Sequence, residues 1–365
     1  MKRLIILNPH SRNGAGGRVF ARGRSELERK LGRFELYETQ ARGDATAKVR
    51  SVLEAGECDQ ILIAGGDGSI NEAVCGYWGA GSLTDLEVPL GVINLGTGGD
   101  FYRTVTASSA NYEEALIANQ LHRVDLATMT SVEGQMTSVE GQMTSVEGQA
   151  PDKGQAPDKG QAPDKGQAPD KGQAPDKGQA SDKGQASDKG GACRPFLNIS
   201  SVGMAGEMLQ SLKNSRFQAG APAYFFHTLK TLLRYRPVPV FVDWTDATGV
   251  TRHLETDLLN LFVCNGRFSG GGMEWAPRAT LDSGELHVTI ISGTKKWPLV
   301  RHSGKLYRGK IETFPGASSF AARELTIRCE SKLSLETDGE VVTLPEGVES
   351  KFEFKVLGGV FPLVL

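Results

Sequence analysis

The stretch Gln60-Ile61-Leu62-Ile63-Ala64-Gly65-Gly66-Asp67-Gly68-Ser69 decides the fold class of this chain. Its apolar run, Ile61–Ala64, is typical of a strand buried on both faces of a parallel sheet. The glycine-rich turn Gly65–Ser69 follows at once, and the apolar pattern from Ile70 to Tyr77 predicts a helix after it. Glycine lets backbone N–H groups approach phosphate oxygens, and the positive end of the helix points toward them. The stretch therefore predicts a strand, a phosphate-binding turn and a helix.

Residues 1–125 repeat this alternation of strand and helix. Further strands are expected at Leu4–Leu7, Phe34–Glu38 and Leu90–Ile93, and further helices at about 18–31 and at Ala45–Ala55. Such alternation with short connections is typical of a parallel sheet covered by helices on both faces. The strand at Leu90–Ile93 ends in a second glycine-rich turn, Asn94–Phe101. We therefore predict an α/β, doubly wound nucleotide-binding domain over 1–125, with its ligand outside the carboxyl ends of the strands.

Composition limits the classes of protein to which the chain can belong. The formal net charge of −2 over 365 residues gives no basic excess, so nucleic-acid binding is not expected. The five cysteines are scattered, as expected for reduced thiols in the cytoplasm. No apolar run approaches the roughly 18 residues that a membrane-spanning helix needs. We therefore expect a cytoplasmic protein whose contact with a membrane, where it occurs, is peripheral.

A low-complexity segment divides the chain. From Met129 the unit Met-Thr-Ser-Val-Glu-Gly-Gln occurs three times, and units of the type Ala-Pro-Asp-Lys-Gly-Gln follow to Gly191. The second kind of unit has no large apolar residue, so it cannot offset the entropy of ordering the chain. We expect 129–191 to be a disordered loop, or alternatively a tether for a partner, between strands at His122–Ala127 and Pro195–Ser200. Because loop-closure entropy grows only logarithmically with length, these strands can still pair as a hairpin.

The remaining segment, 192–365, has a different character. Short β-branched or alternating runs predict strands at Val238–Trp244, Leu258–Asn265, Glu285–Ile291, Leu325–Cys329 and Phe352–Val356. This pattern predicts an antiparallel β-sandwich domain. One helix is expected at about Ala223–Arg234, and the basic sequence Arg234-Tyr235-Arg236 ends it. Its apolar stripe suits either packing in the core or peripheral contact with a membrane.

Several motifs occur in the order in which they occur in a known family. In the first domain they are Asn8-Pro9-x-Ser11, Thr39 with Gly43-Asp44-Ala45, Gly65–Glu72 and Gly96–Phe101. After the repeat they are Phe196–Gly203, Asn265-Gly266-Arg267 with Gly270–Met273, Pro277-x-Ala279 with Asp282–Leu286, and Asp338-Gly339-Glu340. As an ordered set these motifs resemble the diacylglycerol-kinase catalytic family, which includes bacterial lipid kinases, sphingosine kinases and ceramide kinase. The resemblance covers the chain except for about 129–191.

Two positions depart from the pattern of that family. Its second glycine turn usually reads Pro-x-Gly-Thr-x-Asn-Asp-Phe, whereas this chain has Asn94 in place of the proline and Gly99 in place of the asparagine. Loss of the asparagine side chain removes a hydrogen-bonding group near the nucleotide or the substrate. The difference therefore bears on the identity of the substrate and on the activity.

The resemblance implies an ATP-dependent lipid kinase whose active site lies in a cleft between a nucleotide-binding domain and a lipid-binding β-sandwich domain, with a carboxyl terminus that can return to the first domain. For the nucleotide it implies Asn8, Thr39, Gly65, Gly66, Asp67, Gly68, Ser69, Asn71, Gly96 and Thr97. It implies Glu340 as the acceptor of the proton from the lipid hydroxyl group. Asp67 would hold Mg²⁺ or steer the acceptor, and it is the rival base. A structural Mg²⁺ is implied near Thr280, Ser283 and Glu285, bound largely by backbone oxygens.

Other interpretations stay open. On its residues alone, Asp338-Gly339-Glu340 is typical of a solvated hairpin turn, and the turn at Ser283 is as typical of a site without metal. Gly-Gly-Asp-Gly turns also occur in NAD kinases and phosphofructokinases. Gly99 leaves room for a protein that binds a lipid or a nucleotide without catalysis. These residues do not determine which lipid is bound or whether the chain forms a homodimer.

Overall fold

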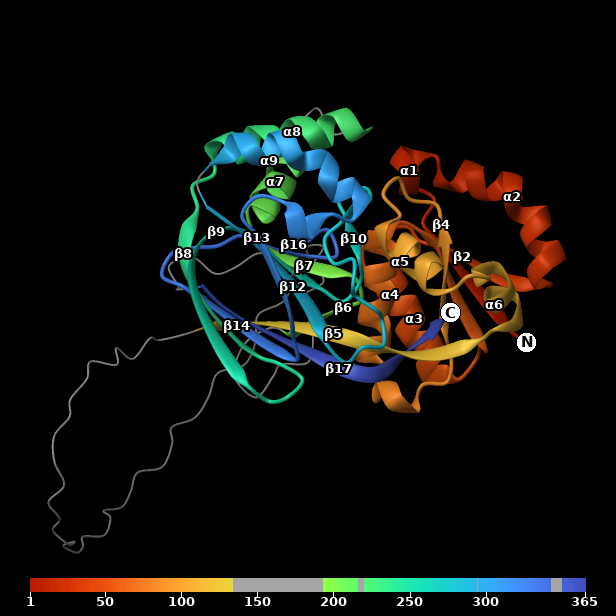
Figure 1. The fold of residues 1–365 in the computed structure, drawn as a ribbon. Helices are drawn as coiled ribbons and strands as arrows, with labels where there is room; N and C mark the ends of the chain where they lie inside the picture. The colour runs from red at the N-terminus through yellow and green to blue at the C-terminus, as the bar shows by residue number, and fades with distance from the viewer. Residues whose placement is uncertain (134–192, 216–219, 294, 343–349) are drawn as a thin grey trace, which may run out of the picture. The chain divides into compact units, whose positions relative to one another are not determined.

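In the computed structural model, which describes residues 1–133, 193–215, 220–293, 295–342 and 350–365, a parallel sheet forms the first half (Figure 1). Its strands are β1 (Arg3–Leu7), β2 (Phe34–Glu38), β3 (Gln60–Gly65) and β4 (Leu90–Asn94), in the spatial order β2-β1-β3-β4. Leu7, at the end of β1, lies beside both Glu38 and Ala64. The carboxyl ends of the strands therefore share one edge, which is where such a sheet binds its ligands.

Helices connect these strands and cover the sheet. They are α1 (Ser11–Gly14), α2 (Gly16–Leu31), α3 (Asp44–Ala55), α4 (Asp67–Gly79), η1 (Leu83–Asp85), α5 (Asp100–Ser108) and α6 (Tyr112–Ala118). The helix expected from Ile70 begins earlier, at Asp67, because Ser69 and Ile70 already donate their N–H groups to Gly66 O at 2.9 and 3.2 Å. The glycine turn is therefore shorter than predicted, and Gly68 lies in the first turn of α4.

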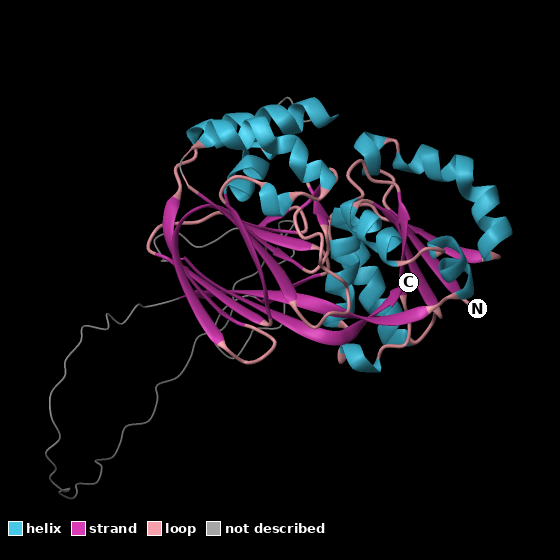
Figure 2. Cartoon of the chain, in the orientation of Figure 1, coloured by secondary structure: helices cyan, strands magenta, loops and turns pink. Residues whose placement is uncertain are grey.

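Antiparallel strands dominate the second half (Figure 2). They are β5 (Leu121–Glu133), β6 (Cys193–Phe196), β7 (Ile199–Gly203), β8 (Val238–Thr245), β9 (Thr251–Cys264), β10 (Phe268–Ser269), β11 (Met273–Glu274), β12 (Leu286–Ser292), β13 (Ala317–Ala322), β14 (Glu324–Cys329), β15 (Leu335–Thr337), β16 (Glu340–Val342) and β17 (Ser350–Val364). A continuous hydrogen-bonded path runs β16-β15-β7-β9-β8-β14-β17. The predicted fold class, a parallel α/β sheet followed by an antiparallel β domain, is confirmed.

The helical segments of the second half are α7 (Met204–Lys213), α8 (Gly220–Arg234), α9 (Lys296–His302), η2 (Ser303–Arg308) and η3 (Ile311–Thr313). The helix expected at about 223–234 corresponds to α8. Within the described ranges, no helix combines the length and the apolar character that crossing a bilayer requires.

The start of the repeat belongs to an ordered strand. β5 continues through Met129 to Glu133, so the expectation of disorder from Met129 onward was wrong for these first residues. β6 pairs with β5 in antiparallel register, from Ala127 opposite Phe196 to Thr130 opposite Cys193, as expected for the two arms of a hairpin. The rest of the repeat, 134–191, lies outside the described residues.

The expectation of one strand over Pro195–Ser200 was wrong. The chain leaves β6 after Phe196 and enters β7 at Ile199. β6 pairs with β5, whereas β7 pairs with β9 and β15. The break exists because the backbone N–H groups of 197–199 all turn toward one buried carboxylate of the second half.

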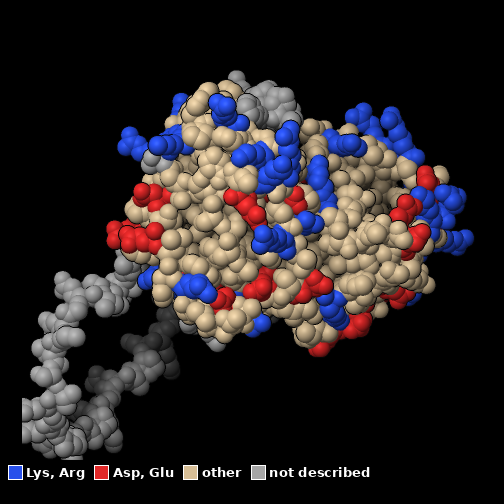
Figure 3. All heavy atoms as spheres, viewed as in Figure 1, with Lys and Arg blue, Asp and Glu red and all other residues tan. Residues whose placement is uncertain are grey.

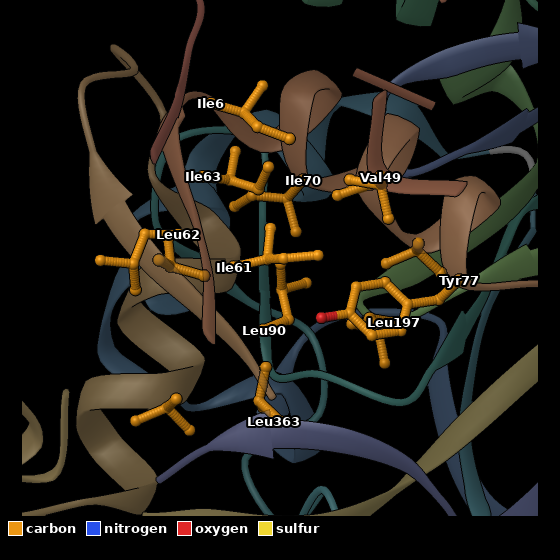
Figure 4. Packing of buried hydrophobic residues seen from close by; sticks show 14 of the residues in the cluster. Ile6, Val49, Ile61, Leu62, Ile63, Ile70, Tyr77, Leu90, Leu197 and Leu363 are labelled. Atoms are coloured by element: carbon orange, nitrogen blue, oxygen red, sulfur yellow. The ribbon is translucent and has the colours of Figure 1, made fainter. Parts of the chain in front are cut away.

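The last strand ties the second half to the first. β17 pairs with β14 and β5 and then reaches β4, where Leu363 lies beside Leu90 in parallel register. Phe361 and Leu363 are fully buried in the core of the first sheet, and Leu197 joins them there (Figure 4). The ring centroid of Tyr77 lies 5.0 Å from that of Phe361. The hydrophobic core of the first half therefore includes side chains from the second half.

Truncation of Leu363 tests this shared core. We expect Leu363→Ala to lower the free energy of unfolding by about 2–4 kcal/mol, because it removes buried methyl groups and leaves a cavity. Leu365→Ala removes the same atoms from a partly buried side chain and should cost less than about 1 kcal/mol. Urea unfolding followed by circular dichroism measures both variants. Equal losses would show that the end of β17 contributes no special packing.

Candidate functional site

Two glycine turns lie against each other at the carboxyl ends of β3 and β4. Leu95 donates its N–H group to Gly65 O at 2.8 Å. A Cβ atom on Gly96 would lie 2.7 Å from the Cα atom of Gly66, closer than real Cβ atoms approach. Only glycine at position 96 therefore lets the two backbones come this close. The turns that the sequence indicated separately form a single site.

Side chains from the end of β1 lie beside the first turn. Asn8 donates from Nδ2 to Ser69 Oγ at 3.0 Å. A Cβ atom on Gly65 would lie 2.6 Å from Ser69 Oγ and 3.5 Å from Asn8 Cβ, so these three residues converge. Thr39 is buried, and it donates its N–H group at 2.9 Å to Leu7 O, the carbonyl that precedes Asn8. The predicted residues of β1, β3 and the start of α4 are thus neighbours.

The amino-terminal end of α4 can bind an anion. Its N-cap residue is Gly66, so no side chain accepts the first N–H groups of the helix. The helix dipole adds partial positive charge at this end. Gly68 is exposed in the first turn, and Thr97 is exposed in the neighbouring glycine turn. Backbone N–H groups and a hydroxyl group in this arrangement suit phosphate oxygens.

Ser11 is a further candidate that the sequence did not single out as a ligand. Its Oγ is buried but has no hydrogen-bond partner in the part of the chain that the structure describes. A Cβ atom on Gly16 would collide with this hydroxyl group and lie 2.8 Å from Asn8 O. The next two residues, Arg12 and Asn13, have positive φ angles of 53° and 54°, which is strained backbone for residues other than glycine. An unpartnered hydroxyl group on a strained turn next to Asn8 is a typical signal of a binding site.

Asp67 joins the two glycine turns through a helix cap. Its Oδ1 accepts the N–H group of Phe101 at 3.0 Å, and its Oδ2 accepts that of Asp100 at 3.3 Å. These are the first N–H groups of α5, whose own N-cap residue, Gly99, has no side chain. A carboxylate in this position stabilises a helix by about 1 kcal/mol. Asp67 therefore has a structural task that the sequence did not predict.

Asp100 links the two halves. Its carboxylate accepts the N–H groups of Gly271 at 2.9 Å and Gly272 at 2.7 Å, and it pairs with Arg103 at 2.9 Å. Burial raises the pKa of Asp100, although the backbone donors and the Arg103 guanidinium oppose the rise. The motif analysis placed Asp100 only in a turn. No local pattern can reveal a contact between residues 171 positions apart.

The two positions that depart from the family pattern touch each other. Gly99 has a φ angle of +61°, and a Cβ atom on it would lie 2.4 Å from Asn94 Nδ2. Asn94 Oδ1 accepts the N–H group of Gly96 at 3.0 Å, which holds the side chain across the turn. The amide of Asn94 therefore fills the space that a side chain at position 99 would take. The two departures compensate each other in space.

Asp338 is a buried carboxylate in the turn between β15 and β16. Positive φ angles at Asp338 (+48°) and Gly339 (+82°) match the type I′ turn that an Asp-Gly pair predicts. The carboxylate turns inward, where it accepts the N–H groups of 197–199 at 3.0 to 3.3 Å and the side-chain amide of Asn71 at 3.1 Å. Burial raises the pKa of Asp338 to about 6. Asn71, predicted to bind the nucleotide, thus bonds α4 to this hairpin.

Glu340 follows this turn and lies at the amino-terminal end of α4. Its Oε2 accepts from Arg42 Nη2 at 2.9 Å, and the two side chains are 31% and 75% exposed. A Cβ atom on Gly68 would lie 3.8 Å from Glu340 Oε1. A carboxylate of the second half therefore stands beside the helix end that suits phosphate. The sequence indicated Glu340 but gave no sign of Arg42.

The three residues predicted to hold a metal meet around one hydroxyl group. Ser283 Oγ lies 3.4 Å from Thr280 O and 3.0 Å from Glu285 O. Oxygen atoms are the ligands that Mg²⁺ prefers. No group of three or more His, Cys, Asp or Glu side chains within the described ranges is arranged to hold a metal. A metal in this turn would therefore depend on backbone oxygens, and its presence stays a prediction.

The predicted nucleotide residues, Asn71 excepted, thus gather around the first turn of α4 and the second glycine turn. Two surface hollows, of about 240 and 440 Å³, lie elsewhere. Leu83 and Leu357 line the first, and Glu207 and Lys332 line the second. None of the predicted site residues lines either hollow, and the cleft that the resemblance implied corresponds to neither of them.

Comparison with family models agrees with this division into two halves. A model described as diacylglycerol kinase catalytic domain matches residues 2–129. A model described as YegS C-terminal NAD kinase beta sandwich-like domain matches residues 198–355. A third, described as trappin protein transglutaminase binding domain, matches residues 146–174, within the repeat. The first two models together cover both halves of the described structure.

Individual proteins give the same indication. A "Probable lipid kinase YegS-like" protein of Cronobacter sakazakii is 25% identical over 297 residues, which are 80% of this chain and 75% of that protein. A "Diacylglycerol kinase" of Staphylococcus epidermidis is 33% identical over 129 residues, which are 35% of this chain and only 39% of that protein. The crystal structure of a diacylglycerol kinase from Bacillus anthracis str. Sterne has a TM-score of 0.58 at 17% identity and covers 100% of this chain and 96% of that one. This last likeness shows a shared fold.

The contact between Asn94 and Gly99 predicts that substitutions there are not additive. Asparagine tolerates positive φ angles well, so Gly99→Asn tests the clash with Asn94 rather than backbone strain. We expect Gly99→Asn to lower the free energy of unfolding by about 1–2 kcal/mol, because one amide must be expelled. Adding Asn94→Ala should recover most of that loss, a coupling of about 1 kcal/mol. Urea unfolding of the four proteins in this cycle measures the coupling, and strictly additive losses would contradict the contact.

Asp338→Asn tests the link between the hairpin and α4. Asparagine keeps the size of the residue and its tolerance of a positive φ angle. Its NH₂ group, however, replaces an oxygen that accepts two of the four N–H groups, so donors would face donors. We expect a loss of about 1–3 kcal/mol in the free energy of unfolding. Asn71→Ala removes only one donor and should cost less. Thermal unfolding at neutral pH compares the two, and an unchanged midpoint in Asp338→Asn would refute the role given to this carboxylate.

Proposed function

We propose that this chain, which belongs to the YegS-like lipid kinase family with its diacylglycerol kinase catalytic domain, transfers the γ-phosphate of ATP to the hydroxyl group of a lipid. The observation that carries the proposal is the position of Glu340 beside the first turn of α4. For a hydroxyl group to attack a phosphorus atom, a proton acceptor and a phosphate-binding group must lie close together. Here each of them comes from a different half of the chain.

The phosphate groups of the nucleotide would lie against the paired glycine turns and the first turn of α4. Backbone N–H groups there donate to phosphate oxygens, and the hydroxyl groups of Ser69, Thr97 and Ser11 add further contacts. The bond from Asn8 holds Ser69 in place. Because the turns are packed backbone against backbone, the donors are positioned in advance and need little reorganisation.

Glu340 would take the proton of the lipid hydroxyl group while the new O–P bond forms and the bond to ADP breaks. The Arg42 guanidinium pairs with this carboxylate at 2.9 Å and holds it beside the first turn of α4. Since Arg42 is 75% exposed, water screens the pair, and it can open at small cost when the lipid arrives. The acceptor is a diacylglycerol-like lipid or a sphingoid base.

A Mg²⁺ ion, when bound with ATP, neutralises the charge that develops on the phosphate oxygens. The carboxylates of Asp67 and Asp100 would hold such an ion, since their Oδ2 atoms lie 3.1 and 3.6 Å from one point, a Cβ atom built on Gly98, and therefore face the same side of the second glycine turn. Both carboxylates also bind backbone N–H groups. We therefore assign Asp67 to the positioning of α5 and of the second glycine turn, and Glu340 to the proton transfer.

Glu340→Gln tests the proposed base. We expect kcat to fall by about 10²–10⁴-fold, the usual contribution of a general base. The Michaelis constant for ATP should stay unchanged, because the first half holds the nucleotide. A panel of lipids in detergent micelles, incubated with labelled ATP and Mg²⁺ and analysed by mass spectrometry, supplies both values.

Two control variants sharpen this test. Arg42→Gln removes the partner of Glu340 and should lower kcat by less than about tenfold. Asp67→Asn should lower the thermal midpoint as well as the activity, since it weakens the cap of α5. If Asp67→Asn is inactive while Glu340→Gln keeps its activity, Asp67 rather than Glu340 is the general base. A wild-type protein that phosphorylates no lipid of the panel would refute the proposed function.

A further inference from the structure

The surface formed by α8, α9 and η2 is anchored from its inner side. Leu232 of α8, Leu299 of α9 and Leu306 of η2 are buried in one hydrophobic cluster. Lys296 donates from Nζ to Leu233 O at 2.8 Å, which bonds the start of α9 to the end of α8. Figure 1 shows these two helices side by side. We use the name α8–α9 face for the exposed side chains of residues 226–236 and 295–310.

Large apolar side chains point outward on the α8–α9 face. Trp297 is 75% exposed, Leu233 59%, Tyr307 57% and Phe226 54%. Phe226 and Leu233 are seven residues apart and therefore lie on the same side of α8. The other exposed large hydrophobic side chains of the described residues lie outside this face: Met1, Phe241 and Val250. Single exposed apolar residues need no explanation, whereas a cluster of this kind marks an interaction surface.

The charge of the α8–α9 face is entirely positive. Its two segments contain nine Lys and Arg residues and no Asp or Glu, although the whole chain has 41 basic and 43 acidic residues. The nine are Lys230, Arg234, Arg236, Lys295, Lys296, Arg301, Lys305, Arg308 and Lys310. Within the described parts of the chain, none of them forms an ion pair with an acidic side chain. Figure 3 shows Lys and Arg gathered along the edge of the molecule where α8 and α9 lie, with acidic side chains next to the lower border of this group.

We propose that the α8–α9 face docks on an anionic membrane surface. Tryptophan and tyrosine favour the level of the lipid head groups, where their rings are half in water and half in lipid. Lysine and arginine next to a negatively charged leaflet are attracted to its phosphate groups. The combination of apolar anchors with basic charge is what stable attachment at a membrane surface needs. The inference rests on the proposed function and deepens it, because a kinase that acts on a bilayer lipid must reach the bilayer.

A membrane matches this face better than a nucleic acid or a protein. A nucleic acid would match the charges, but it offers no apolar medium for Leu233 and Phe226. An acidic protein would need a groove or a flat patch in which to bury these side chains. A bilayer surface offers anionic phosphate groups and an apolar layer beneath them in the required order.

Co-sedimentation with vesicles tests the proposal on the full-length protein without ATP. We expect binding to vesicles of phosphatidylcholine mixed with phosphatidylglycerol, and much weaker binding to phosphatidylcholine alone or at high salt. The triple variant Lys295→Gln, Arg301→Gln, Arg308→Gln should weaken the binding about a hundredfold, since each basic residue is worth roughly a factor of five at an anionic surface. A matched triple variant outside the face, Arg22→Gln, Arg33→Gln, Lys332→Gln, should bind nearly as the wild type does.

Trp297 provides a direct optical readout. Vesicles should shift the tryptophan emission of the wild type to shorter wavelength, and brominated lipids should quench it. Trp297→Phe keeps an aromatic anchor and should still bind. It should lose most of the shift, because the exposed Trp297 changes its surroundings on binding, whereas a buried tryptophan such as Trp275 does not. Trp297→Ala should bind about tenfold more weakly. Binding that is equal for neutral and anionic vesicles, or equal in the two triple variants, would overturn the proposal. So would binding of a polynucleotide or a protein through this face without any binding of vesicles.

The test separates the docking from the kinase activity. Variants of the α8–α9 face should phosphorylate a lipid dispersed in detergent micelles as the wild type does, because they leave the nucleotide site intact. If the wild type does not bind vesicles but phosphorylates a lipid in micelles, the docking proposal is refuted and the proposed function stands. Vesicle binding through this face without transfer of phosphate to any lipid would refute the proposed function alone.

Discussion

The burial of one carboxylate, that of Asp338, is the constraint on which the junction of the two halves depends. A carboxylate removed from water must find donors, and it takes one from Asn71 of α4 and three from consecutive backbone N–H groups. In a strand, successive N–H groups point to opposite sides, so three in a row cannot meet one acceptor. The chain must therefore break at 197–198. The break sends β6 to β5 and β7 to β9, and the same turn delivers Glu340 to the end of α4.

The acidic residues around α4 and α5 differ in what they bind, and this difference assigns their tasks. Asp67, Asp100 and Asp338 each accept at least two backbone N–H groups, which fixes their positions. Glu340 has the guanidinium of the exposed Arg42 as a partner and is itself partly exposed. Under the proposed function, this partial exposure is what leaves Glu340 open to an arriving substrate.

Prediction from the sequence succeeded where the information is local and failed where a distant partner decides the structure. The apolar run Ile61–Ala64 identifies a buried strand by itself, and the close glycine turns follow from it. The pair Asp338-Gly339 is an equally clear local signal for a turn, but it gives no hint that the carboxylate is buried against Asn71, 267 residues away. Pro195–Ser200 has the pattern of a strand, and a group 140 residues away breaks it. In the sequence, Gly99 and Asn94 each look like the loss of a family residue. Only the structure shows that the two residues fit each other.

The balance of charge over the whole chain conceals an asymmetry that bears on how such an enzyme would work. The basic residues of 226–236 and of 295–310 are far apart in the sequence, and only the packing of α9 on α8 makes them one surface. A lipid kinase turns a neutral hydroxyl group into an anionic phosphate group that stays in the bilayer. If this face senses the charge of the bilayer, each turnover makes the surface more attractive to the enzyme. Attraction through charge would then grow with product, beyond the attraction to the anionic lipids that the bilayer holds at the start.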